Sequence, residues 1–514
     1  MAKIEHVFVL MLENRSFDHM FAFSGLAGVV PPANPQFGAN SPDRVPSDPP
    51  HEYEDVKKQI SGGSMNGFVG DGLQGLKPSL IPRLMELAQN FVLMDNWYSS
   101  MPGPTWPNRM FAHAASSCGL DNSLSNGETL KSVISPSAYL NTPNGHIFER
   151  CVAGNVTWRI YKSDPFVQTM AMRGMVDLAT APGNQDKFFR DTYWFASDLK
   201  SGDAAQYTFI EPRFNILNNY RNGNSMHPLG SVAAGDQFVY QIYSAIRKSA
   251  VWESSLLVVS WDEHGGFYDH VTPPAAPPPG ESAVEQEKNH RREAAPGDCK
   301  FDALGPRVPA LLISPYMPKG KLGSALFPGS LFDHSSIVAS LRETFPALGA
   351  PLTDRDRNAP TWTSGLQPKI RTDISMPTAV AKIKAMSTGN VAASRASTKQ
   401  KLDGNLAGFG HVAALVDWSM AKHASLQPLA VSHFTAKRMT AHALLQGRKT
   451  LDQAPVISRN DMLRYIAAVE RRANTYIKSQ TTVHFTKLTG NAPKKRAKSR
   501  PAKKRRQLTA KRAS

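Results

Sequence analysis

The feature that most constrains the fold is the apolar run 7–12, which ends directly in Glu13 and Asn14. A run without polar alternation is typical of a strand that is covered on both faces, as in a parallel sheet, and we expect this strand to begin at His6. Ligands of α/β proteins bind just beyond the carboxyl ends of such strands. Glu13 and Asn14 are therefore candidate ligands of a metal or a substrate. The alternative is a polar strand end that only caps the next helix.

A second segment repeats this pattern, because the apolar run 256–261 is followed directly by Asp262 and Glu263. Other strand-like segments alternate with helical ones along the chain. This alternation predicts an α/β fold in which a parallel sheet is flanked by helices on both sides. The further expected strands lie within 91–100, at 157–162, at 206–210 and at 308–314, and the expected helices include 51–60, 81–90, 236–249 and 335–345.

The composition of the chain changes at about Asp373. Beyond this point the strand-like segments stop, Ala, Lys, Ser and Thr dominate, and the segments 406–420 and 461–477 have helical periodicity. We therefore expect three parts: an α/β domain over 1–372, a mostly helical region over 373–490 and a disordered tail over 491–514.

The positive charge of the chain is concentrated at its end. The net charge is +17, but the tail 491–514 holds eleven Lys and Arg and no acidic residue, which leaves +6 for residues 1–490. Such a tail predicts electrostatic contact with an anionic membrane or with nucleic acid, or it is only a solubilising end. Nothing in the sequence indicates an obligate protein partner.

The sequence offers few signals about the compartment. No apolar run is long enough for a membrane-spanning helix, and the chain enters its first strand without a signal peptide. The default expectation is a cytoplasmic protein, or a secreted one if a leader has been removed. The cysteines Cys118, Cys151 and Cys299 lack CxxC spacing, so we expect reduced, structural thiols rather than a zinc site.

A third polar segment, PGPTWPNR at 102–109, has the features of a helix start. Pro107 suits the first helical turn, with Thr105 just outside it. The backbone N–H groups at a helix N-terminus attract anions, phosphate above all. A hydroxyl there that touches a divalent cation can become a nucleophile. Thr105 is thus a candidate nucleophile, although it would also serve as a simple helix cap.

The polar side chains at the two strand ends supply only oxygen atoms as ligands. Oxygen ligands suit a hard divalent cation of the Ca, Mg or Mn class better than zinc. Carboxylates that cluster without a cation would repel one another. The residues of this candidate metal site are Glu13, Asn14, Asp262 and Glu263.

Taken together, these segments resemble the phosphoesterase family that includes bacterial and plant non-specific phospholipases C and related acid phosphatases. The matching motifs, in the family's order, are ENRSFDHMF at 13–21, SMPGPTWPNR at 100–109, FIEPR at 209–213, MHP at 226–228, DEHGGFYDHVTPP at 262–274, GPRVPALLISPY at 305–316 and DHSSI at 333–337. The resemblance implies an alkaline-phosphatase-like, three-layer α/β/α sandwich with a mostly parallel sheet. It also implies hydrolysis of phosphate esters, so that 1–372 would be the catalytic domain.

The resemblance further implies roles for individual residues. Glu13, Asn14, Asp262 and Glu263 look like metal ligands, and Thr105 looks like the nucleophile, which also faces the metal. In the family, this position is Thr or Ser.

Three histidines, His51, His227 and His334, match histidines near the phosphate in the family. We expect His334 or His227 to give the proton that the leaving alkoxide needs, because histidine exchanges protons near neutral pH. His334 is favoured over His227, since the segment around MHPLGS departs from the family's usual run with two prolines and Asp236 stands where Glu is common.

Other polar residues of these motifs are expected to have a structural role or a role in the candidate site. Arg109 would reach the substrate phosphate from the first helical turn, or it pairs with an acid. His264 and His270 are expected to be structural. Glu211 and Arg213 are expected to form a structural ion pair, with support of the site as the alternative.

The sequence separates some functions and leaves others open. The T-x-P-x-R pattern at 105–109 also occurs in sulfatases, but those need Cys or Ser at the first position for formylglycine, which threonine cannot provide. The expected function is metal-dependent cleavage of phospholipids of the phospholipase C type, through a phospho-threonine intermediate. The alternatives are a broad-specificity acid phosphatase and, in another class, a protein that binds nucleic acid or membrane through its basic tail.

Overall fold

The computed structural model of the protein describes residues 3–124, 129, 142, 144–181, 184–280, 299–377, 404–424, 427–430 and 457–489. The basic tail at 491–514 lies outside the described residues, so its expected disorder and binding stay predictions. No helix of the described part is long and apolar enough to span a bilayer.

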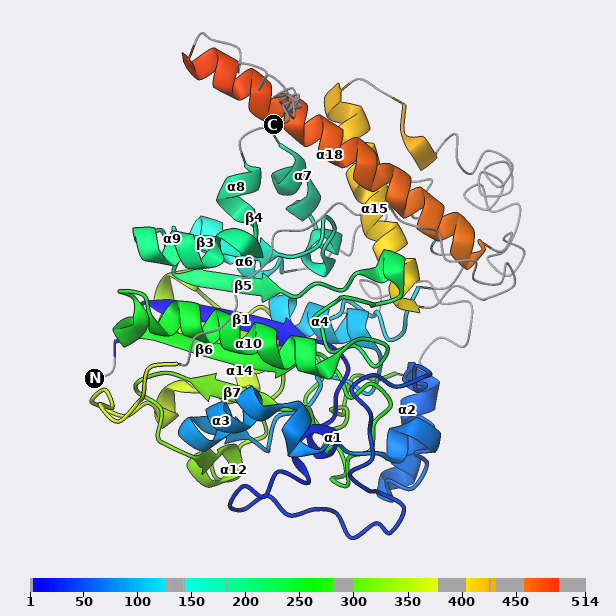
Figure 1. Cartoon of the computed structure of the whole chain (residues 1–514), viewed down its shortest axis with the longest axis vertical. Helices are drawn as coiled ribbons and strands as arrows, with labels where there is room; N and C mark the ends of the chain where they lie inside the picture. The colour runs from blue at the N-terminus through cyan, green and yellow to red at the C-terminus, as the bar shows by residue number, and fades with distance from the viewer. Residues whose placement is uncertain are drawn as a thin grey trace, which may run out of the picture.

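An eight-stranded sheet forms the centre of the molecule, with the strand order β4-β3-β5-β1-β6-β7-β2-β8 (Figure 1). All neighbouring strands pair in parallel except β7, which is antiparallel to both β6 and β2. The strands are β1 (His6–Leu12), β2 (Val92–Met94), β3 (Trp158–Lys162), β4 (Phe189–Asp191), β5 (Tyr207–Glu211), β6 (Ser255–Trp261), β7 (Ala310–Ile313) and β8 (Lys321–Leu322).

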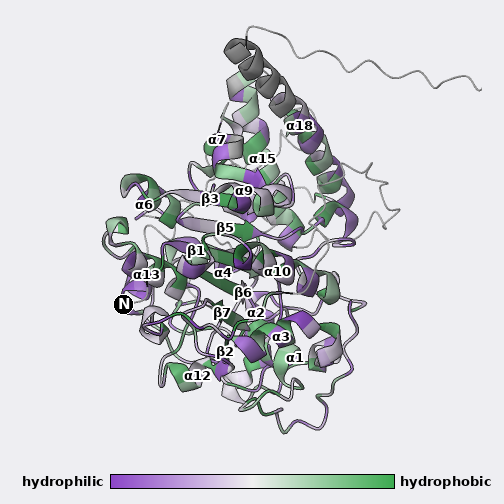
Figure 2. Cartoon of the chain, turned by 60° about the vertical axis from the view of Figure 1, so that its left-hand side comes forward, coloured by the Kyte–Doolittle hydropathy of each residue, from purple (hydrophilic) through white to green (hydrophobic). Residues whose placement is uncertain are grey.

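The two longest and mostly apolar strands, β1 and β6, lie side by side in the middle of this sheet. Apart from the first residue of β1, every residue of both strands is buried. Figure 2 shows the central strands as the most hydrophobic part of the fold. Burial on both faces is therefore the reason for the continuous apolar sequence.

Helices cover both faces of the sheet. On one face α10 (Val232–Arg247) packs against α3 (Pro82–Asn90) and α9 (Phe195–Ser201), and Figure 1 shows α10 in front of β1 and β6. A second group packs together from α4 (Thr105–Ala114), α13 (Ser335–Thr344) and α6 (Ile147–Ala153). The predicted α/β sandwich with a mostly parallel sheet is confirmed. The shorter helices are α1 (Phe17–Phe21), α2 (Tyr53–Ile60), α7 (Met175–Thr180), α8 (Gln185–Phe188), α12 (Gly323–Leu326) and α14 (Asp354–Asn358).

Asp236, which departs from the family's usual Glu, lies away from the strand ends in α10. Its carboxylate accepts the backbone N–H of Leu84 at 2.8 Å and that of Arg83 at 3.3 Å, in the first turn of α3. Asp236 thus caps α3 from a neighbouring helix, a role for which either acid would serve.

The described part of the C-terminal region is helical. The helices α15 (Gly404–Ala424) and α18 (Arg459–Thr489) pack against each other, and α15 also packs against α7 and α4 (Figure 1). The sequence of α15 is apolar on nearly all sides, which is typical of a helix that is buried all round. The expected helical character is thus observed here, whereas the division of the chain at residue 372 stays a prediction.

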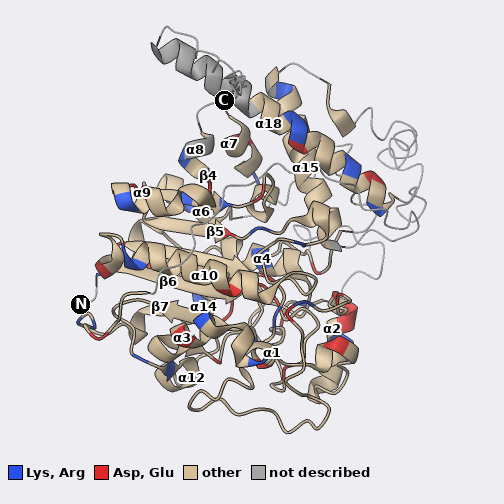
Figure 3. Cartoon of the chain, in the orientation of Figure 1, with Lys and Arg blue, Asp and Glu red and all other residues tan. Residues whose placement is uncertain are grey.

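Lys and Arg residues of the described part are scattered over helices and loops of both the sheet domain and the C-terminal helices (Figure 3). The three cysteines are all described, and no disulfide links them.

Candidate active site

The first polar residues after β1 and β6 leave the sheet at the same edge. The two strands pair in parallel, and the last pair of their register joins Leu12 to Trp261. The residues that follow are therefore neighbours, as the sequence predicts. Four of them are fully buried: Glu13, Asn14, Asp262 and Glu263.

Hydrogen bonds fix Asn14 against the end of β6. The backbone N–H of Asn14 donates to Asp262 Oδ1 at 3.0 Å, and the N–H of Arg15 donates to the carbonyl oxygen of Glu263 at 2.9 Å. Asn14 has a φ of 56°, in the left-handed region that asparagine tolerates better than most residues. Gly265 has a φ of +66°, and a Cβ there would lie 2.3 Å from the carbonyl oxygen of Asn14, so the loop requires glycine.

The side-chain amide of Asn14 joins the candidate nucleophile to a carboxylate. Its Nδ2 lies 3.2 Å from Thr105 Oγ1 and 3.5 Å from His51 Nε2. The same nitrogen is in very close contact with Glu263 Oε1. A 180° rotation of the Asn14 amide about χ2 would place Oδ1, in place of Nδ2, next to Thr105 Oγ1, His51 Nε2 and Glu263 Oε1. Residues from three distant parts of the chain thereby meet at one side chain.

Thr105 is the first residue of α4, one position further into the helix than the sequence predicts. The preceding residue, Pro104, is the N-cap, and no side chain caps the helix. The N–H groups of the first turn have no partner within a helix, so they remain able to bind an anion beside the Thr105 hydroxyl.

Asn108 holds the loop that leads into α4. Its Nδ2 donates to the carbonyl oxygens of Gly103 at 2.9 Å and Pro104 at 3.1 Å, and its Oδ1 accepts the N–H of Met101 at 3.1 Å. Asn108 is fully buried. Because these bonds fix the backbone directly before Thr105, Asn108 determines where the hydroxyl lies. Our sequence interpretation missed this role, although Asn108 is part of the quoted motif.

Burial and mutual repulsion alter the pKa values of the clustered carboxylates. Burial, and then the charge of Asp262, raise the pKa of Glu13 to about 8. Burial likewise raises the pKa of Asp262 to about 6, against the opposing effect of Arg109. Burial would also raise the pKa of Glu263, but the positive charge of His51 and hydrogen bonds around it lower this pKa overall. The cluster therefore favours any added positive charge.

Two oxygen atoms of this cluster, Glu13 Oε2 and Asn14 Oδ1, are buried and have no hydrogen-bond partner within the described part of the chain. A buried polar atom without a partner destabilises a fold by about 1–3 kcal/mol. A cation would satisfy both atoms and offset the repulsion between the carboxylates. The donor set, which is all oxygen, fits a hard divalent cation.

Arg109 lies behind Asp262 and is almost fully buried. Its Nε donates to Asp262 Oδ2 at 2.9 Å, and its Nη1 lies 3.9 Å from Glu211 Oε2. This geometry matches the expected alternative, in which Arg109 pairs with acids, and a contact with the substrate phosphate stays a prediction. The structure pairs Glu211 with Arg109 in place of Arg213, whose Nε has no hydrogen-bond partner among the described residues.

His51 is the histidine of the site that is partly open to solvent, with 15% of its side chain exposed. Its Nδ1 lies 2.6 Å from the carbonyl oxygen of Pro49, and its Nε2 lies 3.9 Å from Glu263 Oε1. Burial lowers the pKa of His51, but the charges of Glu263 and Asp48 and the bond to Pro49 outweigh it and raise the pKa to about 10. The two carboxylates therefore favour the protonated form of the ring.

His227 is buried and stacks on Tyr220, with 3.5 Å between the ring centres. Its Nε2 lies 3.6 Å from Asp48 Oδ2. Burial, and then the charges of His51 and Arg15, lower its pKa well below the ordinary value. His227 is therefore neutral at neutral pH, and a role as proton donor stays a prediction that the geometry does not favour.

His334 contacts a metal-ligand candidate through the backbone. Its Nε2 lies 2.6 Å from the carbonyl oxygen of Asp262, and its Nδ1 accepts a hydrogen bond from Trp97 Nε1 at 3.3 Å. Burial lowers its pKa to about 4. Both ring nitrogens are thus used by the protein, which favours a role in positioning Asp262. The expected role as proton donor stays a prediction.

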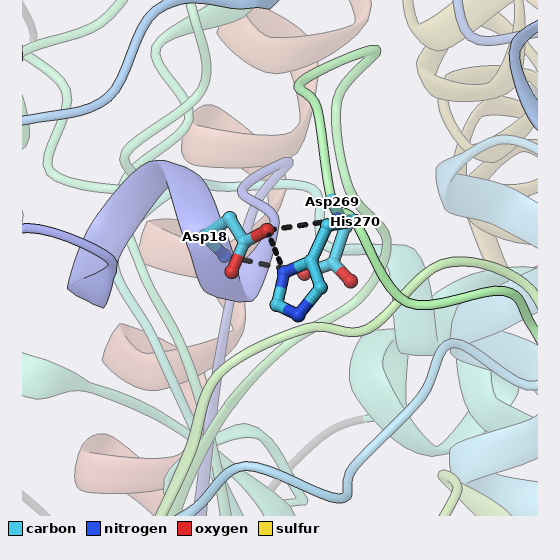
Figure 4. A group of neighbouring side chains, drawn as sticks. All are labelled: Asp18, Asp269 and His270. Atoms are coloured by element: carbon cyan, nitrogen blue, oxygen red, sulfur yellow. Dashed lines mark hydrogen bonds and ion pairs between the residues drawn. The ribbon is translucent and has the colours of Figure 1, made fainter. Parts of the chain in front are cut away.

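A second group with metal-ligand chemistry consists of Asp18, Asp269 and His270 (Figure 4). Asp18 Oδ2 lies 2.6 Å from His270 Nδ1. Arg307 donates to Asp18 Oδ1 at 3.0 Å and to Asp269 Oδ1 at 2.9 Å. The arginine already supplies the positive charge between the two acids, so we interpret the group as an ion-pair network. This agrees with the structural role expected for His270.

His264 is also structural in its contacts. Its Nε2 lies 2.8 Å from Gln59 Oε1, and its Nδ1 lies 3.3 Å from Glu263 Oε2. The ring is completely buried. His264 therefore ties Glu263 to Gln59 in α2.

One residue of the site comes from the C-terminal region, where no functional residue was predicted. Asn405, in the first turn of α15, donates to Glu13 Oε1 at 2.9 Å. A single asparagine separated from Glu13 by 392 positions gives no signal in the sequence.

The chain matches the Phosphoesterase family over residues 4–347, which include every site residue described above except Asn405. The chain belongs to this family. The resemblance inferred from the motifs is thus confirmed. The phosphoesterase is 34% identical over 405 residues to non-specific phospholipase C3 of Arabidopsis thaliana, which covers 70% of this chain and 72% of the relative. It is 27% identical over 421 residues to phospholipase C A of Mycobacterium tuberculosis, with 71% of this chain and 75% of the relative covered.

Solved structures with a similar arrangement are more distant from this phosphoesterase. A protein in the alkaline phosphatase superfamily from Vibrio parahaemolyticus has a TM-score of 0.32 and 13% identity, over 70% of this chain and 70% of that chain. The lipoteichoic acid synthase LtaP from Listeria monocytogenes has a TM-score of 0.33 and 10% identity, over 68% of this chain and 76% of that chain. Neither likeness is close enough to assign a residue.

Proposed function

We propose that this phosphoesterase cleaves phospholipids in the manner of a phospholipase C, releasing diacylglycerol and a phosphorylated head group. The plant relative, at 34% identity, and the mycobacterial relative, at 27% identity, are both named phospholipases C. The observation that most supports the chemistry is the position of Thr105, whose Oγ1 lies at an uncapped helix N-terminus and 3.2 Å from the amide of Asn14.

A divalent cation of the Ca, Mg or Mn class would be held by Glu13, Asn14, Asp262, Glu263 and the hydroxyl of Thr105. When bound, such a cation lowers the pKa of a hydroxyl and offsets the charge of the phosphate. The buried oxygens of Glu13 and Asn14 that lack a partner among the described residues support this assignment.

Thr105 acts as the nucleophile in two displacement steps. In the first, the hydroxyl releases its proton to solvent water and Thr105 Oγ1 forms a bond to phosphorus, while the bond from phosphorus to the alcohol oxygen breaks. The N–H groups of the first turn of α4 stabilise the charge on the other phosphate oxygens. In the second, water forms a bond to phosphorus, the bond from phosphorus to Thr105 Oγ1 breaks, and the Thr105 alkoxide takes back a proton from solvent water.

His51 supplies the proton that the departing alcohol needs. A general acid must be protonated at the working pH and must reach the leaving oxygen. His51 is placed for this role, because its Nε2 lies 3.5 Å from the Asn14 amide that also contacts Thr105, and 15% of its side chain is exposed. After the alcohol leaves, His51 takes a proton from the attacking water and is restored.

The experiment that tests this function is a substrate panel applied to the wild-type protein and to Thr105→Ala. We expect the wild type to release diacylglycerol from phosphatidylcholine, and we expect Thr105→Ala to lose at least about a thousandfold in kcat, since the nucleophile is absent. Thr180→Ala removes another buried threonine hydroxyl, whose partners are Val176 and Ser419 and no residue of the site, so it should leave kcat within about twofold.

Two results of this panel would count against the proposal. Near-normal turnover by Thr105→Ala would exclude Thr105 as the nucleophile. A wild-type protein that hydrolyses p-nitrophenyl phosphate and other phosphomonoesters but leaves phospholipids intact would favour the alternative, a broad-specificity acid phosphatase.

A further inference from the structure

The first turn of α15 contacts the candidate metal site directly. Asn405 Nδ2 donates to Glu13 Oε1 at 2.9 Å and to the hydroxyl oxygen of Tyr220 at 2.9 Å. Its Oδ1 accepts from Trp106 Nε1 at 3.1 Å and from Gln168 Nε2 at 3.5 Å. Both ends of this amide are therefore fully used.

The partners determine which end of the Asn405 amide faces which residue. The indole N–H of Trp106 can only donate, so the amide oxygen must face it. An ionised Glu13 carboxylate can only accept, so the amide nitrogen must face Glu13. Asparagine meets both demands with a single short side chain, and no other arrangement of its two ends satisfies these partners.

The packing of α15 holds Asn405 in this position. A Cβ on Gly408 would lie 2.0 Å from the indole ring of Trp106, so the helix approaches this ring as closely as a glycine allows. Phe409 packs edge-on against Trp106, with 5.6 Å between ring centres, and also contacts Phe214 at 5.3 Å. Trp106 directly follows Thr105 in α4, so the helix from the C-terminal region packs on the neighbour of the nucleophile.

A neutral donor has a particular advantage beside Glu13. Asn405 satisfies one carboxylate oxygen and leaves the other, Oε2, without a hydrogen-bond partner among the described residues. A lysine or arginine here would neutralise the carboxylate and compete with a cation, whereas an acid would repel it. The amide fixes the orientation of Glu13 and keeps its charge available, as partners of metal ligands generally do.

We propose that Asn405 is a positioning residue of the active site, which orients Glu13 for the divalent cation and makes α15 part of the catalytic unit. This rests on the proposed function in one respect, the cation at Glu13. It goes beyond that function because it assigns a role to the C-terminal region, which the family match over residues 4–347 does not include.

The direct test is Mn²⁺ binding to the full-length protein, measured from the electron paramagnetic resonance signal of free Mn²⁺. The side chain of leucine is similar in volume to that of asparagine and has no polar atoms. We therefore expect Asn405→Leu to bind Mn²⁺ about 10–100-fold more weakly than the wild type. Saturating Mn²⁺ should then restore most of kcat, because only the affinity for the cation has changed.

Ser419→Ala is the matched control on the same helix. Ser419 is buried and bonds to Thr180 and Asp177, away from the strand ends. Its loss should leave Mn²⁺ affinity within about twofold of the wild type. If Asn405→Leu does not fold, Tyr220→Phe removes a single acceptor of the Asn405 amide and should weaken Mn²⁺ binding by about fivefold.

Each outcome bears on the proposal. Wild-type affinity in Asn405→Leu would overturn it, and so would equal losses in Asn405→Leu and Ser419→Ala, because Asn405 would then act only through the docking of α15. A wild-type protein that binds no Mn²⁺ would overturn both the positioning role and the metal site. If the affinities change as expected but phosphate esters are not hydrolysed, the positioning role stands and the proposed function fails.

Discussion

His51 differs from the other two candidate histidines in what surrounds its ring. His334 uses both nitrogens for bonds within the protein, and His227 is stacked on Tyr220 and stays neutral. The Nε2 of His51 instead faces Asn14 near the candidate nucleophile, and the pKa of the ring is raised to about 10. We therefore expect proton transfer to the leaving group to depend on His51.

Replacing His51 by Gln should affect substrates according to how much their leaving group needs a proton. A diacylglycerol alkoxide needs one, whereas p-nitrophenolate leaves readily without it. We expect His51→Gln to lose about 100-fold in kcat/KM on phosphatidylcholine and much less on p-nitrophenylphosphorylcholine. His334→Gln, which disturbs the position of Asp262, should lose equally on both. Equal losses in His51→Gln would show that His51 is not the general acid.

At the scale of an element, the start of α4 has to deliver the Thr105 hydroxyl to the ends of two strands. The loop before it is held by Asn108, through bonds to Gly103, Pro104 and Met101. The start of α3 is held in a comparable way by Asp236, which accepts two of its backbone N–H groups. The two helices differ in that only α4 leads into the site.

This difference predicts that, of two similar mutations, only the one at the start of α4 lowers activity. Asp236→Ala should lower the free energy of unfolding by about 1–2 kcal/mol, as the loss of a helix cap does, and leave kcat/KM unchanged. Asn108→Ala should lower kcat by about 100-fold, since a displacement of about 1 Å in a reacting group has that effect. Urea unfolding and steady-state kinetics would separate them. Unchanged kcat in Asn108→Ala would mean that the loop does not determine the position of Thr105.

Long, buried strands can be predicted from the sequence, whereas short strands cannot. The apolar runs of β1 and β6 identify both strands and the two polar pairs that follow them, because central strands that are covered on both faces are mostly apolar. β4 and β8 were missed, since three and two residues are too short for a pattern. The antiparallel direction of β7 could not be predicted either, because apolar sequence does not encode strand direction.

In the candidate site, too, the sequence predicts local motifs but not the contacts between distant helices and strands. Motifs near the strand ends predict which of their residues meet at Asn14 and Thr105. The partners of Arg109 and His334, and the contact of Asn405 with Glu13, depend on how helices pack across the fold. Such contacts join residues far apart in the sequence, and no local pattern marks them.

At the scale of the whole molecule, the sheet domain and the C-terminal helices meet at the reacting groups. The strands β1 and β6 hold four candidate cation ligands, α4 holds the hydroxyl, and α15 reaches the same point through Asn405. All of these side chains are buried or nearly so, and His51 lies beside them with part of its ring exposed. The central claim that unites these parts is that Thr105 becomes covalently attached to phosphorus.

That claim is tested most directly by quenching the enzyme in acid during turnover and mapping its peptides by mass spectrometry. With phosphatidylcholine as the substrate, we expect a phosphocholine ester on Thr105, and none in Thr105→Ala. With a phosphomonoester that the enzyme accepts, the same peptide should carry phosphate. An adduct on a different residue, or turnover of phosphatidylcholine with no adduct at any quench time while diacylglycerol appears in a burst, would contradict the account.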